Sequence, residues 1–208
     1  MLRVEGDELM GFGALFLGIM FLYDFQVGLR LSGEETAYAM LDLFPDVIGW
    51  ILIFVGLSRL VKHVESLAPL KKFSMLFIPL SLLTLGKDTF FYSTFYVENT
   101  QRFTGEILDF CVHLVELAFL AKLFSQTEKF CRKNGEDKLA ASHANVPRIA
   151  AAEGFLFVLA RGLRLLPLPQ NVLSYVSVIS ILDFLFQVFL IWYGVIAMLR
   201  ALLRLSEN

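Results

Sequence analysis

VLSYVSVISILDFLFQVFLIWYGVIAML, residues 172–199, contains one charged residue, Asp183. An α-helix needs about 20 consecutive apolar residues to cross the hydrocarbon core of a bilayer. A helix also satisfies its backbone polar groups internally, as a chain surrounded by lipid requires. The stretch therefore predicts a membrane-spanning helix.

Five further apolar runs precede this stretch. They cover residues 9–29, 45–61, 73–97, 106–124 and 149–168, and Lys87 and Asp88 interrupt the third. We therefore expect an all-α integral membrane protein, a bundle of about six transmembrane helices in a single domain over residues 1–208. Residues 31–44 are too short and too charged to span, so we expect them along the membrane interface. Residues 125–147 form the one long polar stretch and are expected to be a loop.

The overall composition supports a membrane protein and argues against a nucleic-acid-binding protein. Hydrophobic residues make up 57% of the chain, charged residues make up 18%, and the mean hydropathy is +0.66. Soluble domains carry about 25% charged residues. The net charge of -2 leaves no basic surface for nucleic acid, so we expect no nucleic-acid partner. Cys111 and Cys131 have neither disulfide nor zinc spacing and are expected to be reduced.

Basic residues in short loops indicate the orientation, because Lys and Arg gather on the cytoplasmic side. With a cytoplasmic N-terminus, thirteen of them fall on the inner side and five on the outer side. The pattern therefore predicts that both termini are cytoplasmic.

A stripe of titratable residues follows one face of the predicted span 106–124. Glu106, Asp109, His113 and Glu116 are spaced by 3, 4 and 3 residues, which is the periodicity of one helical face. Such a stripe can relay protons, bind a cation through carboxylate oxygens, or offer ligands to a transition metal. A structural interpretation stays open, in which these acids pair with Arg161 and Arg164 of the next span.

Acids outnumber permanent cations in the predicted spans. We weigh seven of these acids (Asp24, Asp46, Asp88, Glu106, Asp109, Glu116 and Asp183) against the cations Lys87, Arg161 and Arg164. The surplus carboxylates must be protonated, exposed to water or matched by a bound cation, which predicts an outward-open polar pocket. The candidate residues for binding a ligand, proton or cation are Asp109, His113, Glu116, Glu106, Asp183, Arg161, Arg164, Asp24 and Asp88. The sequence identifies no cofactor and leaves a metal undecided.

The first third of the chain resembles a known group. LFLGIMFLYDFQVGL (residues 15–29) contains the pair Asp24-Phe25, and MLDLFPDVIGWILIFVGLSRL (residues 40–60) contains an Asp-Leu-x-Pro-Asp-x-x-Gly-aromatic segment. This pattern resembles a group of uncharacterised small multi-pass membrane proteins of bacteria, chiefly of the Gram-positive kind. The resemblance implies a bacterial inner membrane, and it marks Asp24, Asp42 and Asp46 as shared features without a role.

These patterns together favour a small membrane transporter or transporter subunit that binds a cation or polar solute in an outward-facing acidic pocket. Its partners would be the lipid bilayer, a small cationic or polar solute and another membrane protein. One alternative is a non-catalytic membrane partner or sensor with structural polar seams. A further alternative is a metal-dependent intramembrane enzyme using Asp109, His113 and Glu116. Catalysis is less favoured, because the sequence contains no H-E-x-x-H, G-x-S-x-G or Walker-type motif.

Overall fold

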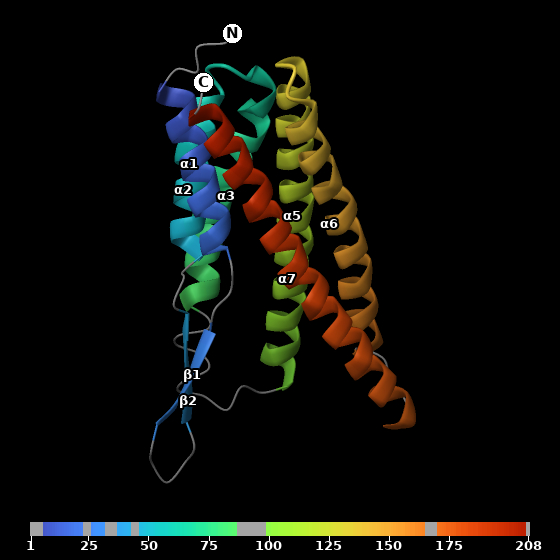
Figure 1. Cartoon of the computed structure of the whole chain (residues 1–208). Helices are drawn as coiled ribbons and strands as arrows, with labels where there is room; N and C mark the ends of the chain where they lie inside the picture. The colour runs from blue at the N-terminus through green and yellow to red at the C-terminus, as the bar shows by residue number, and fades with distance from the viewer. Residues whose placement is uncertain are drawn as a thin grey trace. The chain divides into compact units, whose positions relative to one another are not determined.

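The computed structural model describes residues 6–22, 26–31, 37–42, 46–86, 99–164 and 170–206. These residues form mainly helices, which confirms the helical class (Figure 1). The elements in chain order are α1 (Gly6–Phe21), β1 (Gln26–Leu31), β2 (Ala37–Asp42), α2 (Asp46–Leu60), the 3-10 helix η1 (Glu65–Leu67), α3 (Ala68–Gly86), α5 (Asn99–Lys133), α6 (Asp137–Arg164) and α7 (Gln170–Ser206).

Three helical segments are long and apolar enough to cross a membrane. They are Glu65–Leu83, Phe110–Lys133 and Tyr175–Arg204, which overlap the predicted third, fourth and sixth spans. α1 has 16 residues and α2 has 15. At 1.5 Å per residue both are shorter than the hydrocarbon core, which is about 30 Å thick. Within the described part of the chain, three of the six predicted spans are therefore long and apolar enough to cross a membrane.

A short β-hairpin is an addition that the apolar pattern did not indicate. α1 ends at Phe21, so the helix does not continue through the predicted span 9–29. β1 and β2 pair antiparallel, with Gln26 opposite Asp42 and Leu31 opposite Ala37. Residues 37–42 of the expected interfacial segment are thus a strand. Hydropathy in so short a run does not separate strand from helix, because strand pairing depends on a partner segment.

The predicted polar loop over residues 125–147 is wrong, because helix covers almost all of it. α5 continues to Lys133 and α6 begins at Asp137. The predicted break at Asn134-Gly135 is confirmed: Gly135 has φ +76°, and the Glu136 N–H donates to the Cys131 carbonyl at 2.9 Å. This is a Schellman helix end, in which glycine adopts the left-handed conformation. The other residues are polar, but Glu, Lys and Arg are good helix formers.

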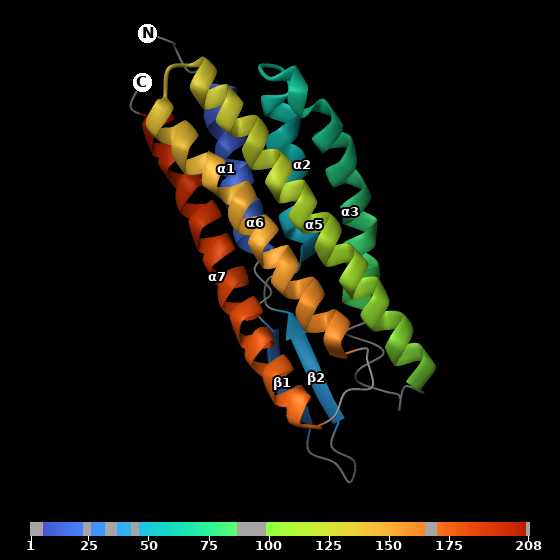
Figure 2. The same cartoon turned by 90° about the vertical axis from the view of Figure 1, so that its right-hand side faces the viewer.

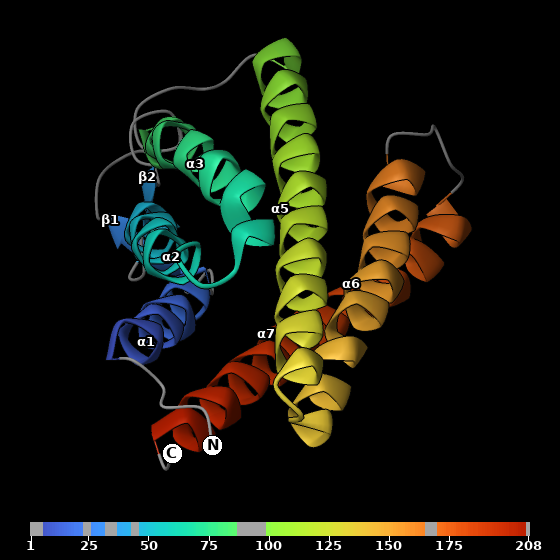
Figure 3. The same cartoon turned by 90° about the horizontal axis from the view of Figure 1, so that it is seen from above.

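The chain divides into two compact units. The first comprises chiefly Arg3–Asp109 and Leu202–Asn208, and the second Phe110–Ala201. In the first unit α1 packs against α2 and α2 against α3, and Figure 3 shows these three helices next to one another. The Trp50 and Phe77 rings stack at 4.0 Å between α2 and α3. Trp50, Leu15 and Ile53 are fully buried in the core of this unit.

Four glycines allow α1 and α2 to touch backbone to backbone. A Cβ atom added at Gly56 would lie 2.7 Å from the Gly11 carbonyl oxygen, and one at Gly18 would lie 2.8 Å from that of Gly49. Real Cβ atoms do not approach so closely, so only glycine fits. Close approach through small residues is how helices associate in lipid, where the hydrophobic effect does not drive them together.

In the second unit, α5 and α6 run antiparallel and α7 packs beside them (Figure 2). The Phe110 and Phe157 rings stack at 5.4 Å between α5 and α6. The Asn145 side chain on α6 donates a hydrogen bond to the Tyr193 hydroxyl on α7 at 3.1 Å. These contacts hold the three helices that contain most of the predicted site.

We predict that Gly56→Ala destabilises the protein by about 1–3 kcal/mol, because the new methyl group forces the α1 and α2 backbones apart. Thermal unfolding in detergent measures the effect. Gly162→Ala is the matched control: it also lies within a helix, but a Cβ atom there meets nothing within 4 Å. Equal melting temperatures for Gly56→Ala and Gly162→Ala would contradict the close α1–α2 contact.

Candidate functional site

A hydrogen bond between His113 and Glu153 joins α5 to α6. The Nε2 atom of His113 lies 2.8 Å from Oε1 of Glu153. The Glu153 side chain is 1% exposed and that of His113 is 20% exposed. The Phe157 ring lies 4.2 Å from the His113 ring and covers it with an apolar surface. The pair therefore combines ionisable groups with burial.

Two further carboxyl groups lie close to this pair. Glu116 is one turn further along α5, and Asp183 is on α7. Both are near enough to His113 to interact with it electrostatically, and both are half-buried. We call His113, Glu116, Glu153 and Asp183 the acidic cluster. Three helices of the second unit contribute to it.

The position of the pair along the helices places it inside two predicted spans. His113 lies seven residues after the start of the span 106–124, and Glu153 lies four residues after the start of the span 149–168. In α5, His113 also lies within Phe110–Lys133, a segment that is long and apolar enough to cross a membrane.

The second carboxyl oxygen of Glu153 is an unusual atom for so buried a position. Oε2 is buried and has no hydrogen-bond partner. An unsatisfied buried polar atom costs about 1–3 kcal/mol, and a charged one costs more. The Oε2 atom can therefore accept one more hydrogen bond or bind one positively charged group.

The structure brings together three of the predicted site residues, His113, Glu116 and Asp183. Arg161 does not join them: it is exposed, and its guanidinium lies 5.7 Å from the centre of the Phe157 ring. The remaining predictions stay untested. The helices α5 and α6 include Asp109, Glu106 and Arg164, whose side chains are not described, and Asp24 and Asp88 lie outside the described residues.

The arrangement needed for a metal is not found in the described part of the chain. No group of three or more His, Cys, Asp or Glu side chains there is placed to hold a metal ion. The third predicted alternative, a metal-dependent enzyme, therefore gains no support from these residues.

Sequence reasoning missed Glu153. A signal was present, since Glu153 is the one acid in the predicted span 149–168. Its importance depends on which residue of α5 it faces. That relation is set by the packing of two helices that are 40 residues apart at this contact.

A second buried histidine is structural. His143 was expected in the polar loop, but it lies on α6 and is fully buried. Its Nδ1 atom donates to the Leu139 carbonyl at 2.9 Å, and its ring packs against Phe124. Burial lowers the pKa of His143, so the ring is neutral at physiological pH.

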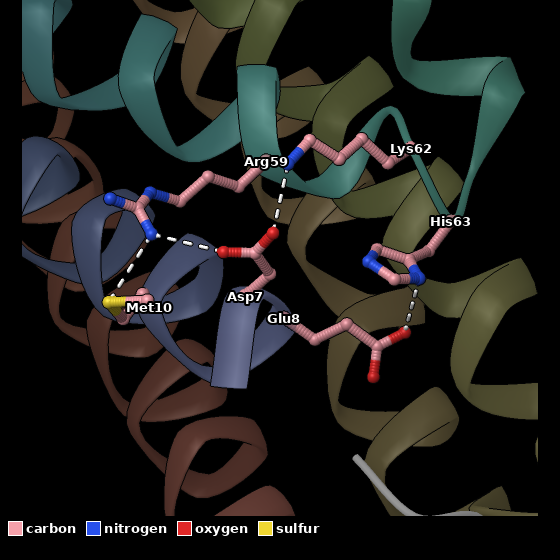
Figure 4. A network of polar contacts seen from close by, with 6 residues as sticks. All are labelled: Asp7, Glu8, Met10, Arg59, Lys62 and His63. Atoms are coloured by element: carbon pink, nitrogen blue, oxygen red, sulfur yellow. Dashed lines mark hydrogen bonds and ion pairs between the residues drawn. The ribbon is translucent and has the colours of Figure 1, made fainter. Parts of the chain in front are cut away.

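A separate polar network ties the start of α1 to the end of α2 in the first unit (Figure 4). The Asp7 carboxylate accepts a hydrogen bond from Lys62 Nζ at 2.9 Å and from Arg59 at 3.4 Å. Glu8 Oε1 lies 3.4 Å from His63 Nδ1. The hydrogen bond and charge of Lys62 lower the pKa of Asp7. The network is partly exposed, and we interpret it as a structural clasp.

Comparison with known proteins adds no family. No family model matches the chain, and no curated protein and no solved structure is similar to it. The acidic cluster and the helical fold are therefore the basis on which function is proposed.

We predict that Asp7→Asn lowers the melting temperature at neutral pH and has no effect in acid. The pKa of Asp7 is lower in the folded protein than its ordinary value of 3.8. The ion pairs therefore stabilise the fold above that ordinary value, and this stabilisation is lost as the pH falls through the lower folded-state value. Thermal unfolding across pH tests this, with the exposed Glu65→Gln as control. High salt should also shrink the difference, and a pH-independent difference would contradict the clasp.

We predict that His113→Leu destabilises the protein by about 1–3 kcal/mol, because it leaves the Glu153 carboxyl without its hydrogen-bond partner. The double variant His113→Leu/Glu153→Met replaces both groups by apolar ones and should recover much of this loss. A double-mutant cycle from detergent unfolding measures the coupling. Additive effects of the two changes would show that the side chains do not interact.

Proposed function

We propose that the chain is a small membrane transporter, or a subunit of one, that binds a cation or a polar solute at the acidic cluster. The observation that carries this proposal is the buried Glu153 carboxyl, which shares its surroundings with His113, Glu116 and Asp183. Ionisable groups at lipid depth are costly, and they usually mark a path for ions or substrates.

The charge within the cluster supports a cationic ligand. It holds three carboxyl groups and one imidazole. Two or three close carboxylates repel one another, which a proton or a cation between them relieves. A bound cation, or the cationic part of a polar solute, would therefore be stabilised here.

In the proposed arrangement the chain crosses the cell (inner) membrane of a bacterium six times, with both termini in the cytoplasm. The three long apolar segments in α3, α5 and α7 support a membrane location. The glycine contacts between α1 and α2 are typical of helices packed in lipid. The stripe continues from His113 through Asp109 and Glu106 toward the outer end of α5, so the pocket would open outward. The bacterial source rests on the resemblance in residues 15–60.

A second candidate is a non-catalytic membrane partner or sensor, in which polar groups only assemble the helices. The hydrogen bond from Asn145 to Tyr193 between α6 and α7 favours it, because it is a polar seam without a titratable group. In both proposals the lipid bilayer surrounds the helices and another membrane protein is a partner.

We predict that Glu116→Gln/Asp183→Asn abolishes ligand binding and leaves the fold intact. The probes are chloride salts of sodium, potassium, magnesium, calcium, choline and spermidine, added to the purified protein in detergent. At 100 times its dissociation constant a bound probe stabilises the fold by about 2.7 kcal/mol. The wild type should melt higher with one of these probes, whereas the double variant should not respond.

The exposed Glu65→Gln variant is the control and should respond like the wild type. Flux of the same probe into liposomes should be lost with binding. A double variant that unfolds without any probe would instead support the structural seam.

A further inference from the structure

The two oxygen atoms of the Glu153 carboxyl have different surroundings. Oε1 lies 2.8 Å from His113 Nε2, and Oε2 is buried without a hydrogen-bond partner. The side chain is 1% exposed, so water does not supply the missing partner from bulk solvent. Oε2 is thus a buried acceptor without a hydrogen bond.

The charged groups around Glu153 come from all three helices of the second unit. His113 and Glu116 lie on α5, and Asp183 lies on α7. On α6 itself, Arg161 is two turns further along and is exposed over Phe157. Among the described residues, His113 is the one group that forms an ion pair with Glu153. Within that part of the chain, no lysine or arginine pairs with this carboxylate.

We propose that the ligand which the site takes up and releases is a proton, held by the His113–Glu153 pair with the acid hydrogen on Oε2. The inference rests on the proposed function and narrows it to a proton-coupled transporter. In the loaded state Glu153 is a neutral carboxylic acid beside a neutral imidazole. In the empty state it is a carboxylate that accepts the His113 N–H.

Loading forms one O–H bond at Oε2 with a proton that arrives from water, and the charge of the pair rises by one. Release breaks that bond, and the proton passes to water through a nearby carboxylate, Glu116 or Asp183. Nothing is oxidised or reduced. The His113 N–H donates to Oε1 in both states, so the contact between α5 and α6 survives the exchange.

One carboxyl oxygen such as Glu153 Oε2 suits a proton better than a metal cation. Calcium takes six to eight oxygen ligands and magnesium needs near-octahedral coordination, whereas a proton needs one lone pair. Burial disfavours a charged carboxyl and favours its neutral acid.

Infrared spectroscopy of the protein in lipid films tests the proposal, because a buried carboxylic acid has its own C=O stretching band. We expect a wild-type band that appears and disappears with pH, that Glu153→Gln removes and that Glu65→Gln leaves unchanged. His113→Gln should keep the band and move its midpoint by about tenfold in proton concentration, a typical influence of one neighbouring group. Circular dichroism checks that each variant is folded.

A band that Glu153→Gln leaves unchanged, or the absence of any titrating band in the wild type, would overturn the proposal. So would a midpoint that His113→Gln does not move. If Glu153→Gln fails to fold, Glu153→Asp keeps the acid on a shorter side chain, and an unshifted band there would also overturn it.

The infrared band can be measured without any solute. Its result is therefore independent of the result of the transport test. If the infrared test fails but a probe binds and is transported, the protein is a transporter that does not hold a proton on Glu153. If Glu153 titrates but the protein binds and transports none of the probes, the proton site is supported and the proposed transport function is contradicted.

Discussion

The hydrogen bond between His113 and Glu153 is the constraint on which the second unit depends. It joins two ionisable groups at a buried position where each alone would be costly, and it connects α5 to α6. The aromatic contact of Phe110 with Phe157 lies one turn away and keeps the same alignment. Sliding one helix by a single turn would break both contacts and leave a buried carboxyl without its donor.

The two polar networks of the chain differ in burial, and so they differ in what they can do. The Asp7 clasp is partly exposed, so water and salt screen its charges and its contribution to stability is modest. Glu153 is buried, and a buried carboxylate without compensation is energetically costly. For this reason we assign a ligand to the acidic cluster and a structural role to the clasp.

The kind of packing between helices differs from one unit to the other. α1 and α2 meet through glycine backbones, while α5, α6 and α7 meet through aromatic rings and polar side chains. Close backbone contact leaves little space for a bound molecule between helices. Between α5 and α6 the contacts are made by side chains, and the ionisable pair His113–Glu153 lies among them.

Residue types and their periodicity by themselves determined the helical class, most helix positions and one face of the site. The runs of apolar residues predicted α7, and the 3-4-3 spacing placed His113 and Glu116 on one face of α5. These features are local, because they depend on neighbours within a few turns. Only the tertiary structure decided that Glu153 faces His113, that β1 pairs with β2 and that four glycines meet between α1 and α2. Each of these depends on the register between segments distant in the chain, and hydropathy along a single sequence does not contain that register.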